Sequence, residues 1–168
     1  MLKLLGRSTG RKRVVRSLYA ATVQRSREPV FFTKLGVPDT LDGRFDLLTL
    51  HAWLVLERLR DAKLADLSQG FMDTVFVGFD ESFREMGAGD MGMGRRMKKL
   101  ADAFYGRLSS YDGSTDVSAL SHSLQRNLYR GVGDMAQAEV VARYIDSARI
   151  SLARGDLTTG ELDFGPLP

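Results

Sequence analysis

The sequence predicts an all-α protein, a compact single-domain bundle of about six helices. Three observations support this fold class: apolar residues recur at helical spacing along most of the chain, no segment shows the alternation typical of a half-buried strand, and glycine and proline gather between the helical segments. The length of 168 residues fits one domain with a real core, and 43% hydrophobic and 27% charged residues are typical of a globular protein.

The first helix is expected from about Ser8 to Arg27. These first 27 residues carry eight basic side chains and no acidic one, whereas the remainder holds 16 basic and 21 acidic side chains. We divide the chain into a basic lead-in over 1–13, a helical domain over 14–155 and an irregular tail over 156–168. A basic amino end on an acidic body predicts contact with an anionic surface, either lipid head groups or RNA. A mitochondrial transit peptide is the alternative interpretation of these residues.

A connector broken by prolines and glycines, "PVFFTKLGVPDTLDG", leads to the second helix. Asp42 is the expected N-cap, and the helix is expected from about Arg44 to Arg60. Because this helix is apolar almost all round, we expect it to be the central, buried one. His51 in its middle is interpreted as a core histidine hydrogen-bonded to a neighbour, with a catalytic role as the alternative.

The third helix is expected from Lys63 to Met86, with an apolar residue at almost every fourth position. Met72 and Phe76 broaden this stripe beyond what one contact surface needs. Ordinary core is one interpretation of the surplus. The other is that part of this phenylalanine and methionine surface is exposed and binds a hydrophobic client.

Three further helices complete the predicted bundle. They are expected over about 91–111, 117–129 and 135–153. Asp112 and Gly113 end the first of them, and Asp116 and Asp134 are the expected N-caps of the other two.

The segment "MGAGDMGMGRRMKK" contains GAGDMG, a literal G-x-G-x-x-G. A dinucleotide-binding loop needs a strand before these glycines, and here a helix precedes them, so phosphate binding is not expected. We interpret Gly87 as the residue that closes the third helix and Asp90 as the cap of the fourth. Gly92 and Gly94 then fall in the first turn, at a cost of about 1 kcal/mol each relative to alanine. Close approach of a neighbouring helix or a partner would explain that cost.

Residue counts exclude several kinds of site. The chain has no cysteine and two histidines, His51 and His122, which excludes disulfides, thiolate zinc sites, a cysteine nucleophile and a histidine-rich metal centre. No catalytic constellation is present. We therefore expect no enzymatic activity, no metal and no cofactor.

Two long blocks carry a resemblance to a known family. "GVPDTLDGRFDLLTLHAWLVLERLR" and "FREMGAGDMGMGRRMKKLADAFYGRL" are similar to the ubiquinol–cytochrome c chaperone family, the assembly factors of the cytochrome bc1 complex, over about Leu18 to Tyr129. The resemblance implies an all-helical domain without enzymatic activity that binds newly made cytochrome b. It also implies cytochrome b or another bc1 subunit as partner. An anionic membrane, which the basic amino end suggests, and the ribosome are further candidate partners, and DNA is not expected.

A client-binding surface is predicted where the third and fourth helices meet, with the polar segment "PDTLDGRFD" as its rim. The candidate residues are Asp39, Arg44, Asp46, Phe83, Met86, Gly89, Asp90, Met91, Met93, Arg95, Arg96, Lys98 and Lys99. Solvated charge without a partner is the alternative interpretation of the basic residues. The alternative function is an RNA- or ribosome-binding helical module that uses the basic amino end and the 95–99 cluster. The expected location is the bacterial cytoplasm, peripheral to the inner membrane, rather than the mitochondrial matrix.

Overall fold

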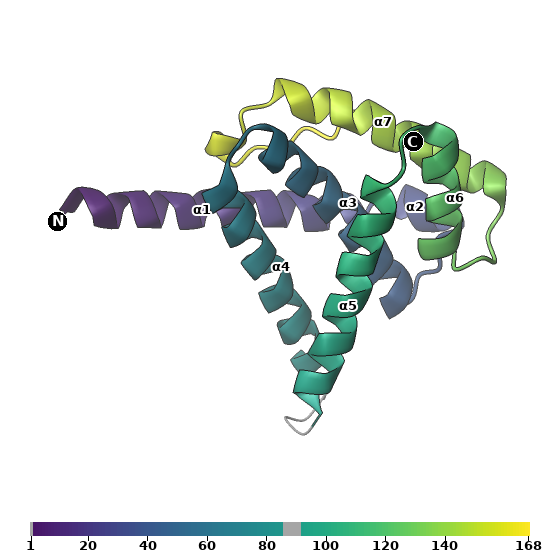
Figure 1. The fold of residues 1–168 in the computed structure, drawn as a ribbon, viewed down its shortest axis with the longest axis horizontal. Coiled ribbons are helices and arrows are strands. Elements are labelled where there is room, and N and C mark those ends of the chain that lie inside the picture. Colours follow the sequence, from purple (N-terminus) through teal and green to yellow (C-terminus); the bar gives the residue numbers. More distant parts are fainter. Residues whose placement is uncertain (1, 86–91) are drawn as a thin grey trace.

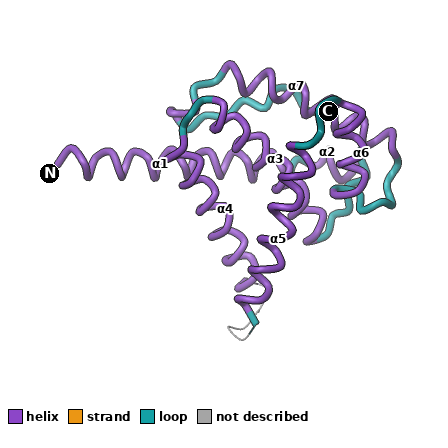
Figure 2. The backbone as a smooth tube through the Cα atoms, viewed as in Figure 1, coloured by secondary structure: helices purple, strands orange, loops and turns teal. Residues whose placement is uncertain are grey.

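Seven α-helices and one 3-10 helix make up the computed structural model of the chain, which describes residues 2–85 and 92–168 and, within the first helix, the side chains from Thr9 onward. In chain order the elements are α1 (Leu2–Ser26), α2 (Pro29–Thr33), α3 (Leu41–Asp61), α4 (Ala65–Glu85), α5 (Met93–Asp112), α6 (Val117–Asn127), α7 (Met135–Arg154) and η1 (Leu157–Thr159). Figure 1 labels the α-helices, and Figure 2 shows that loops join the helices without a strand in the described parts. The predicted all-α bundle is confirmed: six long helices form it, and α2 is a short addition within the predicted connector.

Helix α3 is the central element, as its apolar sequence predicts. It contacts α1, α4, α5 and α7. Leu47, Leu50 and Leu59 are completely buried, and Trp53 is 2% exposed. Burial of each such side chain contributes about 1.5–3 kcal/mol relative to exposure. The other helices are therefore positioned around α3.

The beginning of α3 differs from the prediction. Thr40, not Asp42, is the N-cap, and its hydroxyl accepts a hydrogen bond from the backbone N–H of Gly43 at 3.2 Å. The helix starts at Leu41, so Asp42 falls in its first turn, where a negative charge is favourable. Both residue types cap helices well, and spacing alone did not distinguish them.

Helix α1 begins at Leu2, so the predicted lead-in is part of the helix rather than an extension before it. Val15 and Leu18 are buried on its inner side, and α1 contacts both α3 and α4. Figure 1 shows its amino-terminal part projecting away from the rest of the molecule. Because of this projection, much of the basic surface of α1 faces solvent.

The tail after α7 is irregular apart from η1, and it packs against the body. Phe164 is 5% exposed. The guanidinium of Arg25 donates to the backbone carbonyls of Gly165 and Pro166 at 2.7 and 2.8 Å. The tail is thereby attached to the carboxyl end of α1.

Helices α4 and α5 converge toward the tip of the molecule (Figure 1). On α4 the predicted stripe is inward: Phe71, Val75 and Phe79 are buried. Gly92 is the N-cap of α5, with φ 100°, and so precedes the helix instead of lying in its first turn. Gly94 is in that turn, but no atom lies within 4 Å of where its Cβ would be, so the expected close approach is not found among the described residues. Gly87 and Asp90 lie outside the described residues.

The caps of the last two long helices are confirmed. Asp116 accepts from the N–H of Ala119 at 2.8 Å, and Asp134 accepts from the N–H of Ala136 at 3.0 Å. These bonds satisfy backbone donors that no helical carbonyl can reach. Each helix accordingly starts at the residue after its aspartate.

Candidate functional site

Aromatic side chains join α4 to α5. The Phe76 ring lies 5.4 Å from Phe104 and 6.0 Å from Tyr105, measured between ring centroids. Phe104 is completely buried, whereas Tyr105 is 52% exposed and Val77, the residue after Phe76, is 55% exposed. Tyr105 therefore reaches solvent beside a packed aromatic layer, and Val77 reaches solvent on the turn of α4 that carries Phe76. We call Phe76, Val77 and Tyr105 the apolar surface.

The layer below the apolar surface is part of the core. Phe79 is 7% exposed, with its ring centroid 5.2 Å from that of Phe45 on α3 and 6.1 Å from that of Phe104 on α5. Tilted and edge-on ring pairs of this kind add about 0.5–1.5 kcal/mol each beyond burial. The apolar surface thus rests on three helices that hold one another in place.

The sequence analysis missed Val77 and Tyr105. Both lie next to members of the inward stripes of their helices, so they are apolar residues at positions that face outward. This off-stripe position is the signal that could have identified them.

The predicted methionine and phenylalanine residues are placed differently from expectation. Phe83 is half-buried on α4, and Met93 is 8% exposed, so Met93 belongs to the interior. Met86, Gly89, Asp90 and Met91 lie outside the described residues. Their role in binding a client stays a prediction.

The basic cluster, defined as Arg95, Arg96, Lys98 and Lys99, is exposed on the first half of α5. None of its side chains forms an ion pair with another described residue. At 1.5 Å per residue, Arg95 and Tyr105 are about 15 Å apart along the helix. The same helix therefore carries free positive charge near its start and an exposed ring further along.

Two of the three predicted rim residues are exposed. Asp39 and Arg44 form an exposed ion pair, with 2.7 Å between Oδ1 and Nε, and this hydrogen bond lowers the pKa of Asp39. Asp46 is completely buried, so its expected rim position is wrong. The polar segment is largely structural, because Thr40 caps α3 and Asp46 is part of an internal ion-pair network.

That network joins three parts of the fold. The Nε of Arg107 lies 2.7 Å from Oδ1 of Asp46, an ion pair without a hydrogen bond between these two atoms, and the Nε of Arg130 donates to Oδ2 at 3.1 Å. Arg130 also reaches Asp42 at 2.9 Å. Burial raises the pKa of Asp46 above its usual range, although both arginines act to lower it. The network connects α3 to α5 and to the loop before α7, and it borders the aromatic layer, since the Arg107 guanidinium lies 5.1 Å from the centre of the Phe45 ring.

His51 is the core histidine that the sequence predicts. It is completely buried; its Nδ1 lies 2.8 Å from the carbonyl oxygen of Leu47 and its Nε2 lies 2.9 Å from the Tyr144 hydroxyl. A carbonyl only accepts, so Nδ1 carries the proton and Nε2 accepts from Tyr144, whose oxygen in turn accepts from Arg25 at 2.9 Å. Both ring nitrogens of His51 therefore form hydrogen bonds within the protein.

The described residues provide neither a metal site nor a membrane-spanning helix. No group of three or more histidine, aspartate or glutamate side chains there could hold a metal ion. None of the described helices is long and apolar enough to cross a lipid bilayer.

Comparison with known proteins identifies the family. Residues 33–159 match the family described as ubiquinol-cytochrome C chaperone. The chain belongs to this family. The crystal structure of the Cbp3 homolog from Brucella abortus is similar to this fold with a TM-score of 0.86 and 32% identity, over 99% of this chain and 97% of that one. The similarity to that structure extends over nearly the whole chain and so beyond residues 33–159, which the family matches.

Two relatives from eukaryotes are more distant. Ubiquinol-cytochrome-c reductase complex assembly factor 1 of Xenopus laevis is 26% identical over 159 residues, which are 89% of this chain and 80% of that protein. Protein CBP3, mitochondrial, of Saccharomyces cerevisiae is 28% identical over 148 residues, and the match covers 44% of its length. Membership in a chaperone family confirms the predicted resemblance and the prediction that the protein is not an enzyme.

Proposed function

We propose that this protein is an assembly chaperone for the cytochrome bc1 complex that binds newly made cytochrome b at the membrane surface. Membership in the ubiquinol–cytochrome c chaperone family supports the general role, and the relative from Xenopus laevis is named as an assembly factor of the reductase complex. The observation that carries the more specific proposal is the apolar surface on α4 and α5. Tyr105 and Val77 are each more than half exposed, and the Phe76 ring, which lies 6.0 Å from that of Tyr105, precedes Val77 in α4.

The chemistry of the client explains why such a surface is needed. A cytochrome b helix outside the bilayer exposes apolar side chains. Covering them contributes about 25 cal/mol of favourable free energy for each Å² of apolar surface removed from water. Val77 and Tyr105 are already exposed, so no rearrangement of the fold is needed before they can contact a client. Because only a few side chains take part, the contact is weak enough for release when the complex assembles.

The basic cluster extends this proposal along α5. Four cations that pair with no described residue lie about 9 to 15 Å from Tyr105 along the helix, and they would bind the polar ends of a client helix or the lipid phosphates beside it. The protein would then work in the cytoplasm, peripheral to the inner membrane.

Co-purification from native membranes tests the proposal, with two matched aspartate substitutions. Val77→Asp places a charge on the apolar surface, and Ile150→Asp places one on α7. The two side chains match in exposure, since Val77 is 55% and Ile150 is 57% exposed. We expect cytochrome b to co-purify with the wild type and with I150D, and to be reduced at least tenfold with V77D.

Equal recovery of cytochrome b with both variants would show that the apolar surface is not the binding site. Absence of cytochrome b together with salt-sensitive RNA binding would instead support an RNA- or ribosome-binding module. Since both substituted side chains are exposed, melting temperatures close to that of the wild type are expected for both.

A further inference from the structure

A second charged surface lies on α1, far along the chain from the apolar surface. Thr9, Lys12, Arg13, Arg16, Ser17 and Ala20 line a hollow of about 570 Å³. Their spacing of three and four residues places them along one face of the helix. We call these six residues the α1 stripe.

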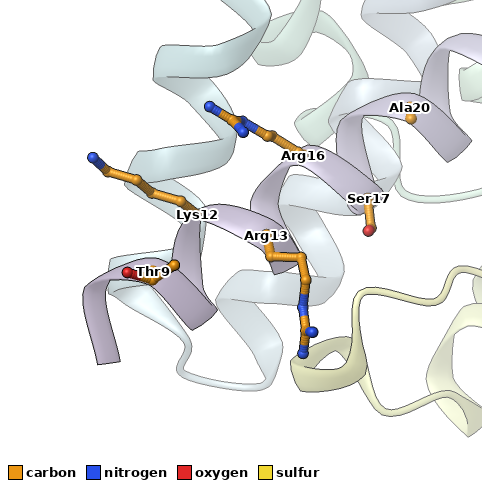
Figure 3. A pocket seen from close by; sticks show the side chains of 6 residues that line it. All are labelled: Thr9, Lys12, Arg13, Arg16, Ser17 and Ala20. Atoms are coloured by element: carbon orange, nitrogen blue, oxygen red, sulfur yellow. The ribbon is translucent and has the colours of Figure 1, made fainter. Parts of the chain in front are cut away.

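The three cations of the α1 stripe are placed on both sides of the hollow. Figure 3 shows Lys12 and Arg16 extending side by side from one edge of the helix, while Arg13 extends from the other edge toward the segment that carries η1. None of the three forms an ion pair with a described residue, whereas the adjacent Arg11 is paired with Asp66 at 3.5 Å. All three are exposed. The stripe therefore holds positive charge that no described side chain neutralises through an ion pair.

The shape of this surface favours one kind of anion. The stripe follows a helix that projects beyond the body (Figure 1), and its uncharged members are the small residues Thr9, Ser17 and Ala20. Exposed cations on both sides of a hollow lined by small side chains can reach the phosphates of a flat lipid surface. The stripe lacks an aromatic side chain on which a nucleic acid base could stack, so single-stranded RNA fits it less well.

We propose that the α1 stripe binds the head groups of anionic phospholipids and attaches the protein to a membrane surface. This inference rests on the proposed function only for the location of the protein at a membrane. It adds the residues and the lipid chemistry that attach the protein there. The cations contact lipid phosphates, and Ser17 is placed to donate a further hydrogen bond. Binding of this kind weakens as salt rises, because it depends on Coulomb attraction at an exposed surface.

Vesicle flotation of the full chain tests the proposal without any client. The probes are vesicles of phosphatidylcholine alone and vesicles in which about a third of the lipid is phosphatidylglycerol. We expect binding to the acidic vesicles only, and loss of binding in about 0.5 M salt. Each basic residue near an anionic surface contributes about fivefold, so the variant K12Q/R13Q/R16Q should bind about a hundredfold more weakly.

A matched control separates the stripe from net charge. The variant R27Q/K34Q/R154Q removes the same number of exposed cations, none of them in an ion pair with a described residue and none in the stripe. We expect it to bind acidic vesicles within a few-fold of the wild type, and both variants to melt at the wild-type temperature. Equal losses in the two variants, equal binding to neutral vesicles, or loss of RNA binding by the stripe variant with lipid binding unchanged would each overturn the proposal. Because no cytochrome b is present, this result is independent of whether the client proposal holds.

Discussion

At the scale of single residues, a buried chain of hydrogen bonds connects three helices. It runs from Arg25 on α1 through the Tyr144 hydroxyl on α7 to Nε2 of His51 on α3. A protonated His51 would present an N–H to a hydroxyl that already accepts from Arg25. The imidazole is therefore held neutral, and burial lowers its pKa from 6.5 to about 4.

This pKa predicts how stability depends on pH. Below pH 6.5 the unfolded chain protonates His51 and the folded chain does not, so the free energy of unfolding decreases as the pH falls from 6.5 to about 4. The shift corresponds to about 3 kcal/mol. Urea denaturation at several pH values measures it, and we expect His51→Gln to flatten the decrease, because glutamine can make similar hydrogen bonds but does not titrate.

His122 provides the control for this measurement. It is exposed on α6, so His122→Gln makes the same substitution outside the core. If H51Q and the wild type lose stability in parallel between pH 6.5 and 4, His51 is not the group responsible.

At the scale of elements, the start of α3 depends on a close backbone contact. A Cβ on Gly43 would lie 1.9 Å from the carbonyl oxygen of Pro38. The peptide carbonyl cannot move aside as a side-chain end could. The short turn through Thr40 into α3 therefore requires glycine at this position.

We predict that Gly43→Ala destabilises the protein by about 1–3 kcal/mol, the usual cost of forcing an extra carbon into a packed site. Urea denaturation followed by circular dichroism gives the value. Gly106→Ala is the matched control, since Gly106 lies within α5 and no atom is within 4 Å of its Cβ position. There alanine should stabilise by up to about 1 kcal/mol through helix propensity. The same sign for both substitutions would contradict the backbone contact as the cause.

At the scale of the whole molecule, charge is distributed over two separate surfaces. The α1 stripe lies on the projecting first helix, and the basic cluster lies near the start of α5 (Figure 1). The proposed client surface lies on α4 and α5. Because the basic cluster is also on α5, it is the charged surface that would lie beside a bound client. The stripe is available for the membrane at the same time.

We therefore predict that Arg96→Glu with Lys99→Glu reduces assembly of the bc1 complex in cells while the helical circular dichroism and the melting temperature stay nearly unchanged. Both side chains are exposed and make no ion pair with a described residue, so the fold loses nothing when their charge is reversed. Lys34→Glu with Arg154→Glu makes the same charge change elsewhere and should leave assembly normal. Normal assembly in R96E/K99E, or failure only through unfolding, would leave solvated charge as the correct interpretation of the cluster.

The sequence by itself determined the features that depend on neighbouring residues. Helical spacing of apolar residues predicted the six long helices and the burial of α3, and aspartates before apolar runs predicted the caps at Asp116 and Asp134. The exposure of the basic cluster also follows from local pattern, because its charges flank a helix whose other face is apolar. These features are local because a helix and its cap are formed by residues within a few positions of one another.

Only the tertiary structure decided which polar residues are buried and which apolar residues are exposed. Asp46 was expected at a rim, but α3 directs it inward, where the side chain of Arg130, 84 residues later in the chain, donates to it. No prediction was made for Val77 and Tyr105, and the packed structure leaves both more than half exposed. Such outcomes depend on how whole helices pack against one another, and that packing is a sum over contacts between residues far apart in the chain.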